Sequence, residues 1–543
     1  SIPFQSSPDL QQIAEVDRML SKLSDDSPEN IRRKADIYKR SRGDNSSWSI
    51  QCLACDLWTS AFFAEFTREN MSKSYITTSE ELKRYLKNQS TDKRLTAYSW
   101  KLAEKHRFFH WPLEFPQVFE QGGFDVILCN PPWERIKLQE QEFFFTRDLE
   151  IAYASNKAAR SKMIRNLPKT KPSLYQEYLD ALHSAEATSK FLRTSDRFPL
   201  TARGDINTYS IFSELFSKII NSLGRSGVVV PTGIATDDTN KDFFSHLVTN
   251  NKLASLYDFE NRAGLFPAVD SRYKFSLLTL RGKFGQLTPS QPSHSLSEVP
   301  SPFMGEDQDE GEITPSQFAF FLTRTEQLKD QHRVFNLTPQ DFKLLNPNTQ
   351  TCPIFRTRED AELTKKIYQR VPVLINEKNG TNPWGVKFMS MFHMSNDSHL
   401  FKIRTELESL GFHLFGNRMV KEEEVYLPLY EAKMIWQFDH RFGTYEGVES
   451  RSSTHLPTPS EKQYQDPNFV AIPWYWVSKE NIINRLGKRE RNWLTGSRDI
   501  ARCTDERTSI FSINGLYATS GLNLFFLKKD SIFVSLFNSN INT

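Results

Sequence analysis

The chain has 543 residues, which is too long for one hydrophobic core and predicts two or three domains. Basic and acidic residues number 69 and 66, so overall charge does not identify a nucleic-acid-binding protein, and any such contact must come from local patches. The 42 phenylalanines and the lack of a long apolar run exclude a disordered chain and a membrane-spanning one, so we expect a soluble cytoplasmic protein.

The cysteines and histidines do not predict a metal site. Five cysteines in so long a chain fit a reducing compartment rather than a disulfide framework. Cys52 and Cys55 form a C-x-x-C pair, but a structural zinc site needs about four ligands and no second pair occurs. Their apolar neighbours predict a buried helix with both thiols inside it. His106 and His110 stand in an aromatic stretch, so we expect them to pack against rings.

Residues 1–123 predict a mainly helical segment that leads into a catalytic domain. One helix is expected around Leu10–Leu23, and another begins at Pro28, because Ser27 suits the N-cap and proline suits the first helical position. The stretch Leu53–Phe66 is apolar almost all round, which predicts a helix buried between layers.

A strand and a rigid turn follow. The apolar run Phe124–Leu128 predicts a buried strand, which must end because Pro131 and Pro132 remove two backbone donors. Ligands of open α/β sheets bind beyond the carboxyl ends of strands, so Asn130 and Trp133 stand where chemistry is expected. An ordinary strand-to-loop turn is the alternative, because Asn and Pro are common turn residues.

The next elements predict a layered α/β domain over 124–282. The stretch after Trp133, up to Lys190, is rich in helix formers and predicts helices that cover the opening of the site at the turn. Asp205 is a candidate N-cap for the helix that follows it. Three further strands are expected, at Gly227–Pro231, Leu253–Phe259 and Tyr273–Leu280. Their alternation with helices predicts a mostly parallel sheet.

The last part of the chain changes character. Residues 283–345 contain a polar and acidic stretch that predicts a mobile loop and a connecting segment, and a different domain is expected over 346–543. Near its end lie Arg485, Lys488, Arg489, Arg491, Arg498 and Arg502. Basic groups near aromatic residues such as Trp474 and Trp476 suit DNA phosphate contacts and base-edge readout, with a solvated charged face as the alternative.

These blocks, in this order, resemble the N6-adenine DNA methyltransferases of the large type IIG restriction-modification and phage-defence kind. The resemblance rests on Asn130-Pro131-Pro132-Trp133 behind an apolar strand, and on the stretches 430–440 and 498–508. It implies a partial Rossmann-like class I methyltransferase sheet with helical insertions, followed by a mixed α+β target-recognition domain.

The resemblance also implies roles for individual residues. The Asn130 side-chain oxygen and the Pro131 carbonyl would accept hydrogen bonds from the amine of a flipped adenine, with Pro132 stiffening the turn. Trp133 would stack on one face of the base and Phe266 on the other. The six basic residues would contact double-stranded DNA.

The cofactor implied is S-adenosylmethionine, and its pocket looks incomplete in this sequence. In the family a glycine-rich turn upstream of the motif holds it, but only Gly43, Gly122 and Gly123 precede Asn130. The cofactor-binding residues therefore stay unknown, with Asp125 and Asp205 as acidic candidates.

The expected function is site-specific adenine methylation of DNA, in a restriction-modification or phage-defence system. Without an upstream strand beside it, the motif strand would be an exposed edge, so we expect a cofactor-binding segment that is missing here or supplied by another polypeptide. A catalytically silent DNA-recognition subunit is the alternative. A part of a bifunctional restriction endonuclease and methyltransferase is a further one.

Overall fold

The computed structural model describes residues 8–154, 156–282, 315–383, 385–451, 456–487, 493–500, 510–515 and 517–526. The chain divides into two compact units, Ser1–Val373 and Leu374–Thr543. Among the described helices, none is both long and apolar enough to cross a membrane.

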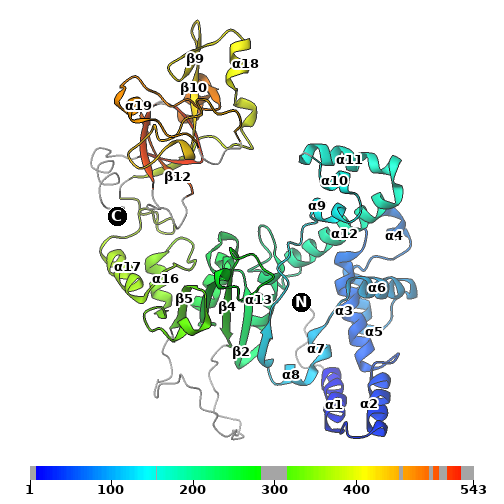
Figure 1. The fold of residues 1–543 in the computed structure, drawn as a ribbon. Coiled ribbons are helices and arrows are strands. Elements are labelled where there is room, and N and C mark those ends of the chain that lie inside the picture. The colour runs from blue at the N-terminus through cyan, green and yellow to red at the C-terminus, as the bar shows by residue number, and fades with distance from the viewer. Residues whose placement is uncertain are drawn as a thin grey trace. The chain divides into compact units, whose positions relative to one another are not determined.

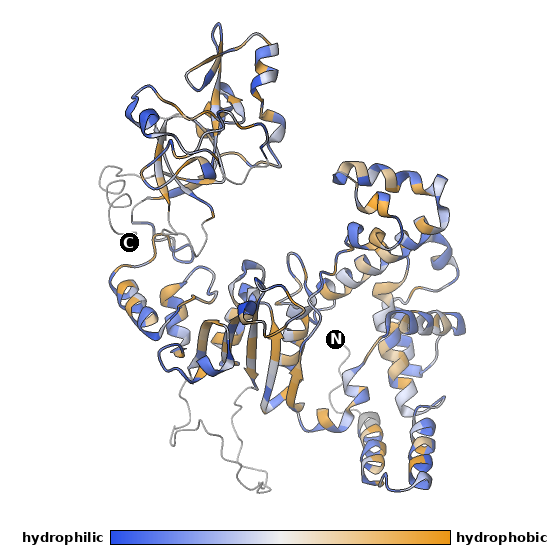
Figure 2. Ribbon diagram, viewed as in Figure 1, coloured by the Kyte–Doolittle hydropathy of each residue, from blue (hydrophilic) through white to orange (hydrophobic). Residues whose placement is uncertain are grey.

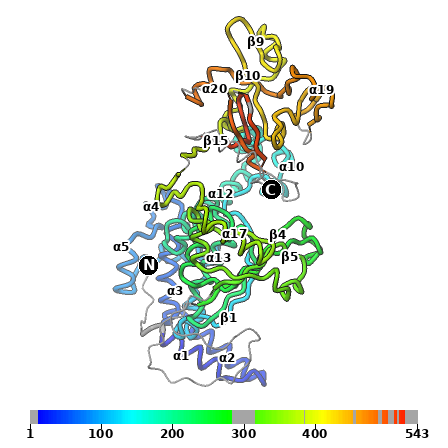
Figure 3. Tube along the Cα trace, turned by 90° about the vertical axis from the view of Figure 1, so that its left-hand side faces the viewer, coloured from blue at the N-terminus to red at the C-terminus, as the bar shows by residue number. Residues whose placement is uncertain are grey.

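The first unit begins with helices (Figure 1). They are α1 (Pro8–Lys22), α2 (Pro28–Ser41), α3 (Ser47–Phe63), α4 (Arg68–Ser72), α5 (Ser79–Asn88), α6 (Lys93–His106), α7 (Trp111–Glu114) and α8 (Pro116–Glu120). The predicted cap of α2 is confirmed, because the Ser27 hydroxyl accepts a hydrogen bond of 3.2 Å from the Asn30 N–H. Helix α3 packs against α1, α5 and α6, so the expected buried helix is also confirmed, although it ends at Phe63 (Figures 1 and 3).

A six-stranded sheet follows, with the strand order β1-β2-β4-β3-β5-β6. Its strands are β1 (Phe124–Cys129), β2 (Ile220–Val230), β3 (Leu253–Glu260), β4 (Lys274–Arg281), β5 (Ser316–Leu322) and β6 (Phe335–Leu337). The α/β class is confirmed, and four strands, β1, β2, β3 and β5, run in the same direction. Strands β4 and β6 run in the opposite direction, so β1 with β2 and β3 with β5 are the neighbouring pairs that are parallel among the described strands.

Strand β1 lies at the edge of this sheet. Within the described residues it pairs with β2 alone, which agrees with the exposed edge expected from the sequence. The side chains of Val126 and Leu128 are 63% and 82% exposed, so the prediction of a buried strand is wrong. Burial needs a neighbour on each side, and the apolar run by itself does not supply one.

Helices cover the sheet and extend from it. Between β1 and β2 run α9 (Glu140–Phe145), α10 (Leu149–Ala152), α11 (Lys157–Thr170), α12 (Pro172–Thr194) and α13 (Thr208–Ile219). Helix α13 is capped by the Asn207 side chain, not by Asp205. The main core joins the sheet to α13, α15 (Lys241–Thr249) and α16 (Pro339–Leu345), where Phe243 and Phe318 are fully buried. Figure 2 shows hydrophobic residues along the strands of this sheet.

The boundary between the units falls later than the sequence indicated. Strands β5 and β6 belong to the main sheet, and α17 (Arg358–Arg370) packs on α16, so described residues from 315 to 373 lie with the first unit. The sequence had placed a connecting segment and the start of the second domain there.

The second unit has the expected mixed α+β composition. One sheet has the order β11-β10-β9-β8, with β14 beside β10, and the other has the order β13-β12-β15-β7. The strands are β7 (Lys387–Ser390), β8 (His413–Phe415), β9 (Arg418–Lys421), β10 (Glu424–Glu431), β11 (Trp476–Ser478), β12 (Trp493–Arg498), β13 (Phe511–Gly515), β14 (Ala518–Ser520) and β15 (Leu522–Phe526). Its helices include α18 (Arg404–Ser409), α19 (Glu461–Gln465) and α20 (Lys479–Leu486).

Candidate functional site

The turn after β1 is held against the next strand of the sheet. Pro131 is buried, whereas Asn130 and Pro132 are exposed. Trp133 is half-buried, and its indole Nε1 donates a hydrogen bond of 3.3 Å to the Val229 carbonyl of β2. The indole is therefore fixed by the sheet, while the amide of Asn130 stays available to a ligand.

A cavity of about 310 Å³ opens at this turn. It is lined by Asn130, Pro131, Trp133, Val229, Asn261, Phe266, Val269, Tyr273, Lys274 and Phe275. The structure thus brings Phe266 to the same cavity as the Asn130 turn, although more than 130 residues separate them along the chain. The volume lies at the lower end of the range for small-molecule sites and accommodates one planar base.

The loop that carries Phe266 is held by Asn261, whose side chain is almost fully buried. The Asn261 Nδ2 donates to the carbonyls of Phe266 and Val269, at 2.9 and 2.8 Å, and its Oδ1 accepts from the Phe266 N–H at 2.9 Å. The Phe266 ring also meets Phe275 edge-on, with 5.0 Å between ring centroids. Sequence reasoning missed Asn261, although it stands just before the glycine-containing turn at 264–267.

The cavity is largely uncharged. Lys274 is the only ionisable cation or carboxylate among the described residues that line it, and its Nζ lies 3.0 Å from Oε1 of the nearly buried Glu260. Glu260 also pairs with Arg262, at 2.6 Å. With the lysine charge balanced in this way, aromatic faces and amide or carbonyl oxygens dominate the cavity. Such a lining suits a neutral, planar heterocycle.

Thr208 fixes the chain where it leaves the turn. Its hydroxyl donates to the Pro132 carbonyl at 2.5 Å and accepts from the Glu134 N–H at 2.9 Å. The Thr208 N–H donates to the Glu134 carbonyl, also at 2.9 Å. Thr208 is the first residue of α13, so these hydrogen bonds join the start of that helix to the turn.

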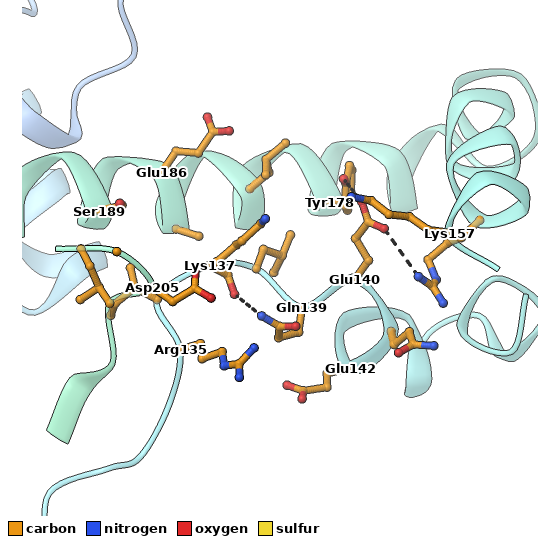
Figure 4. Close-up of a pocket in the computed structure, with 18 of the residues that line it drawn as sticks. Arg135, Lys137, Gln139, Glu140, Glu142, Lys157, Tyr178, Glu186, Ser189 and Asp205 are labelled. Atoms are coloured by element: carbon orange, nitrogen blue, oxygen red, sulfur yellow. Dashed lines mark hydrogen bonds and ion pairs between the residues drawn. The ribbon is translucent and has the colours of Figure 1, made fainter. Parts of the chain in front are cut away.

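The two acidic candidates for cofactor binding lie away from the 310 Å³ cavity. Asp125 stands at the start of β1, at the opposite end of the strand from Asn130. Asp205 lines a second cavity of about 550 Å³, formed with residues 135–142, α11 and α12 (Figure 4). The structure therefore does not bring Asp125, Asp205 and Asn130 together in one site.

The histidines and cysteines considered as metal ligands have structural partners. His106 packs on Phe63, with 4.6 Å between ring centroids, as expected. His110 does not: its Nε2 lies 2.8 Å from Asp56 Oδ1, and the Cys52 thiol donates to the other oxygen of Asp56 at 3.8 Å. Burial, followed by the neighbouring carboxylate, raises the pKa of the Cys52 thiol far above its usual value. Each polar group of this trio is thus satisfied by another.

Only two of the six basic residues predicted to contact DNA are described. Arg485 pairs with Asp397 at 2.5 Å, and Arg498 donates to the Ile435 carbonyl and stacks over Trp436. Both therefore make contacts inside the second unit. Lys488, Arg489, Arg491 and Arg502 lie outside the described residues. Trp476 is fully buried, and its indole donates to the Asn417 carbonyl at 2.8 Å, so it is a core residue rather than a reader of bases.

Residues 11–167 match a family model described as the Eco57I restriction-modification methylase. This range contains β1 and the Asn130–Trp133 turn. The match supports a restriction-modification methylase role for that part of the chain. No curated protein matches the chain.

Several solved restriction-modification enzymes match this chain with low identity and low TM-scores. The type IIL enzyme MmeI in complex with DNA is 8% identical, with a TM-score of 0.31, over 78% of this chain and 44% of that one. The type ISP enzyme LlaBIII bound to DNA is 9% identical, with a TM-score of 0.30, and the match covers 82% of this chain and 26% of LlaBIII. The type IIG endonuclease BpuSI is 12% identical, with a TM-score of 0.21, over 64% and 40%. This chain spans less than half the length of each.

Proposed function

We propose that this chain carries the target-base site of a site-specific N6-adenine DNA methyltransferase. The observation that carries the proposal is the cavity shared by Asn130, Pro131, Trp133 and Phe266. Two hydrogen-bond acceptors at one side and two aromatic groups suit an exocyclic amine on a flipped base. The family match over 11–167 supports methylation as the reaction.

The side chains act on the amine and the ring in different ways. The lone pair of an exocyclic amine is delocalised into the ring, which makes the nitrogen a weak nucleophile. Acceptance of its two N–H bonds by the Asn130 oxygen and the Pro131 carbonyl returns electron density to the nitrogen and fixes its direction. Stacking on Trp133 and Phe266 offsets part of the few kcal/mol that unstacking the base costs.

The described residues do not make a complete site for S-adenosylmethionine. The residues that line the cavity at Asn130 include no carboxylate for ribose hydroxyls. Among the described strands β1 pairs with β2 alone, so a further strand fits along its other edge. A cofactor-binding segment that pairs with β1, from the same gene or another polypeptide, therefore completes the proposed enzyme.

The incomplete pocket predicts the behaviour of the isolated chain. Titration calorimetry of these 543 residues with S-adenosylmethionine should show no saturable binding at micromolar concentration. Addition of the segment that pairs with β1 should create such binding. Micromolar affinity in the isolated chain would contradict the proposal that the pocket is completed from elsewhere.

The reaction itself is tested on the full natural protein or complex that contains this chain. It is incubated with methyl-labelled S-adenosylmethionine and unmethylated duplex DNA, and the nucleosides are then analysed by mass spectrometry. We expect N6-methyladenine. Appearance of N4-methylcytosine would overturn the choice of base. DNA binding without any methylated nucleoside would instead support the catalytically silent recognition subunit, and DNA cleavage would identify the bifunctional alternative.

A further inference from the structure

A third pocket, in the helical part of the first unit, has a strongly basic lining. Its volume is about 540 Å³, and it is lined by Phe63, Glu65, Asn70, Tyr75, Arg94, Ala97, Tyr98, Lys101, Leu102, Lys105, His106 and His183. The lining thus contains three cations and two histidines, and Glu65 is the one carboxylate among these described residues.

Four of the lining residues form a row on helix α6. Arg94, Tyr98, Lys101 and Lys105 are spaced by four, three and four residues, which places them on one face of the helix. We call this row the α6 stripe. Its three cations are exposed, and none of them has a carboxylate within 4.0 Å among the described residues. A charged face that only serves solubility usually mixes both signs, and this one does not.

Two further observations indicate a ligand at the stripe. Tyr98 is stacked on Tyr75, with 5.0 Å between ring centroids and 13° between ring planes, so the pocket has a fixed aromatic wall beside its cations. In the same pocket, the His106 Nε2 is buried and has no hydrogen-bond partner in the described part of the chain. Buried polar atoms usually have partners, and a ligand or solvent molecule in this pocket would supply one.

The length of the stripe distinguishes a linear polyanion from a single anion. From Arg94 to Lys105 the helix rises about 16 Å, at about 1.5 Å per residue. One strand of B-form DNA carries a phosphate about every 3.4 Å along its axis, so the row matches on the order of five phosphates. A free phosphate ion would engage only one end of it.

We propose that the α6 stripe binds the phosphate backbone of double-stranded DNA, as a contact separate from the cavity at Asn130. The identification of the polyanion as DNA rests on the proposed function. Because phosphate contacts carry no sequence information, the stripe adds affinity and orientation rather than site selection. Hydrogen bonds from the Tyr75 and Tyr98 hydroxyls add to the three charges.

The test compares two triple variants with the same change in charge. One is Arg94→Gln with Lys101→Gln and Lys105→Gln. The control is Arg32→Gln with Arg33→Gln and Lys39→Gln in α2, a helix that buries none of its residues. Fluorescence anisotropy of a labelled 40-base-pair duplex is measured between low and moderate salt. Melting curves check that both variants are folded.

The stripe variant should lose about two to three units from the slope of log affinity against log salt, because each phosphate contact contributes about 0.9. Its affinity at low salt should fall on the order of 100-fold, and the control should behave as the unchanged protein. An unchanged slope, or equal losses in both variants, would overturn the proposal. Displacement of the stripe-dependent binding by millimolar inorganic phosphate would show a single-anion site instead.

These outcomes are independent of the chemistry at Asn130. An Asn130→Ala protein should keep the full salt slope, since its target-site change removes no charge. A failure to form N6-methyladenine would thus overturn the proposed reaction and leave the slope measurement valid. A normal methylation product with an unchanged slope in the stripe variant would overturn the stripe alone.

Discussion

Replacement of Asn130 by alanine should lower the rate of methyl transfer about 100- to 1000-fold in the completed enzyme, the loss expected when one fixed hydrogen-bonding group is removed from a reacting centre. The side chain is exposed and makes none of the contacts that hold the turn, so the protein should fold normally. Single-turnover rates with saturating DNA measure the effect.

Binding and chemistry should separate in this variant. DNA affinity should change by less than about twofold, because the amide contacts only the flipped base. Asn130→Asp keeps an oxygen that can accept a hydrogen bond and should retain more activity than Asn130→Ala. Full methylation by the alanine variant would remove Asn130 from the proposed mechanism.

Asn261→Ala should damage the same reaction through the loop that carries Phe266. The change leaves two partly buried backbone groups, the Phe266 N–H and the Val269 carbonyl, without their partner, and the Phe266 carbonyl keeps only the Val269 N–H. Loss of these hydrogen bonds should cost about 2–4 kcal/mol of loop stability, since each unsatisfied group costs about 1–3 kcal/mol. We expect kcat/KM to fall at least tenfold and amide hydrogen exchange in residues 262–272 to accelerate.

A double-mutant cycle distinguishes positioning from general destabilisation. If Asn261 acts by holding Phe266, then adding Asn261→Ala to Phe266→Ala should produce little further loss of kcat/KM. Asn261→Asp keeps the acceptor for the Phe266 N–H and should rescue part of the activity. Asn88→Ala, on an exposed helix end, is the matched control. Fully additive losses would show that Asn261 only stabilises the fold.

The local features of the fold were readable in the sequence. Ser27 and Pro28 mark the start of α2, because a cap depends on a hydroxyl and on N–H groups two or three residues away. The prolines at 131 and 132 likewise end β1 by removing donors within the turn. Such effects involve few neighbours, so the residues themselves are enough to predict them.

Features that depend on distant partners were not readable in this way. Arg485 pairs with Asp397 and Arg498 bonds to Ile435, across 88 and 63 positions of the chain. A basic cluster looks the same in sequence whether its members face DNA or buried carbonyls. Burial of Trp476 depends in the same way on β10, which pairs with its strand.

The candidate site was partly predictable. The motif and Phe266 came from a family resemblance, and the structure places both at one cavity. Asn261 was missed because an amide that bonds to backbone leaves no pattern in a single sequence. The spacing of Arg94, Tyr98, Lys101 and Lys105 was visible, but without α6 and its neighbours nothing showed that Glu65 is the one carboxylate among the described residues that line their pocket.

Thr208 is hydrogen-bonded to Pro132 and Glu134, and the backbone of Asn207 forms an isolated β-bridge with that of Arg135. These contacts hold the two ends of the segment 135–207 next to each other. The segment between these contacts, which includes α9 to α12, also packs on α3 through α12. The hydrogen bonds that hold the turn at Asn130 lie at the ends of this segment, so a proteolytic cut in one of its outer loops should leave the turn in place.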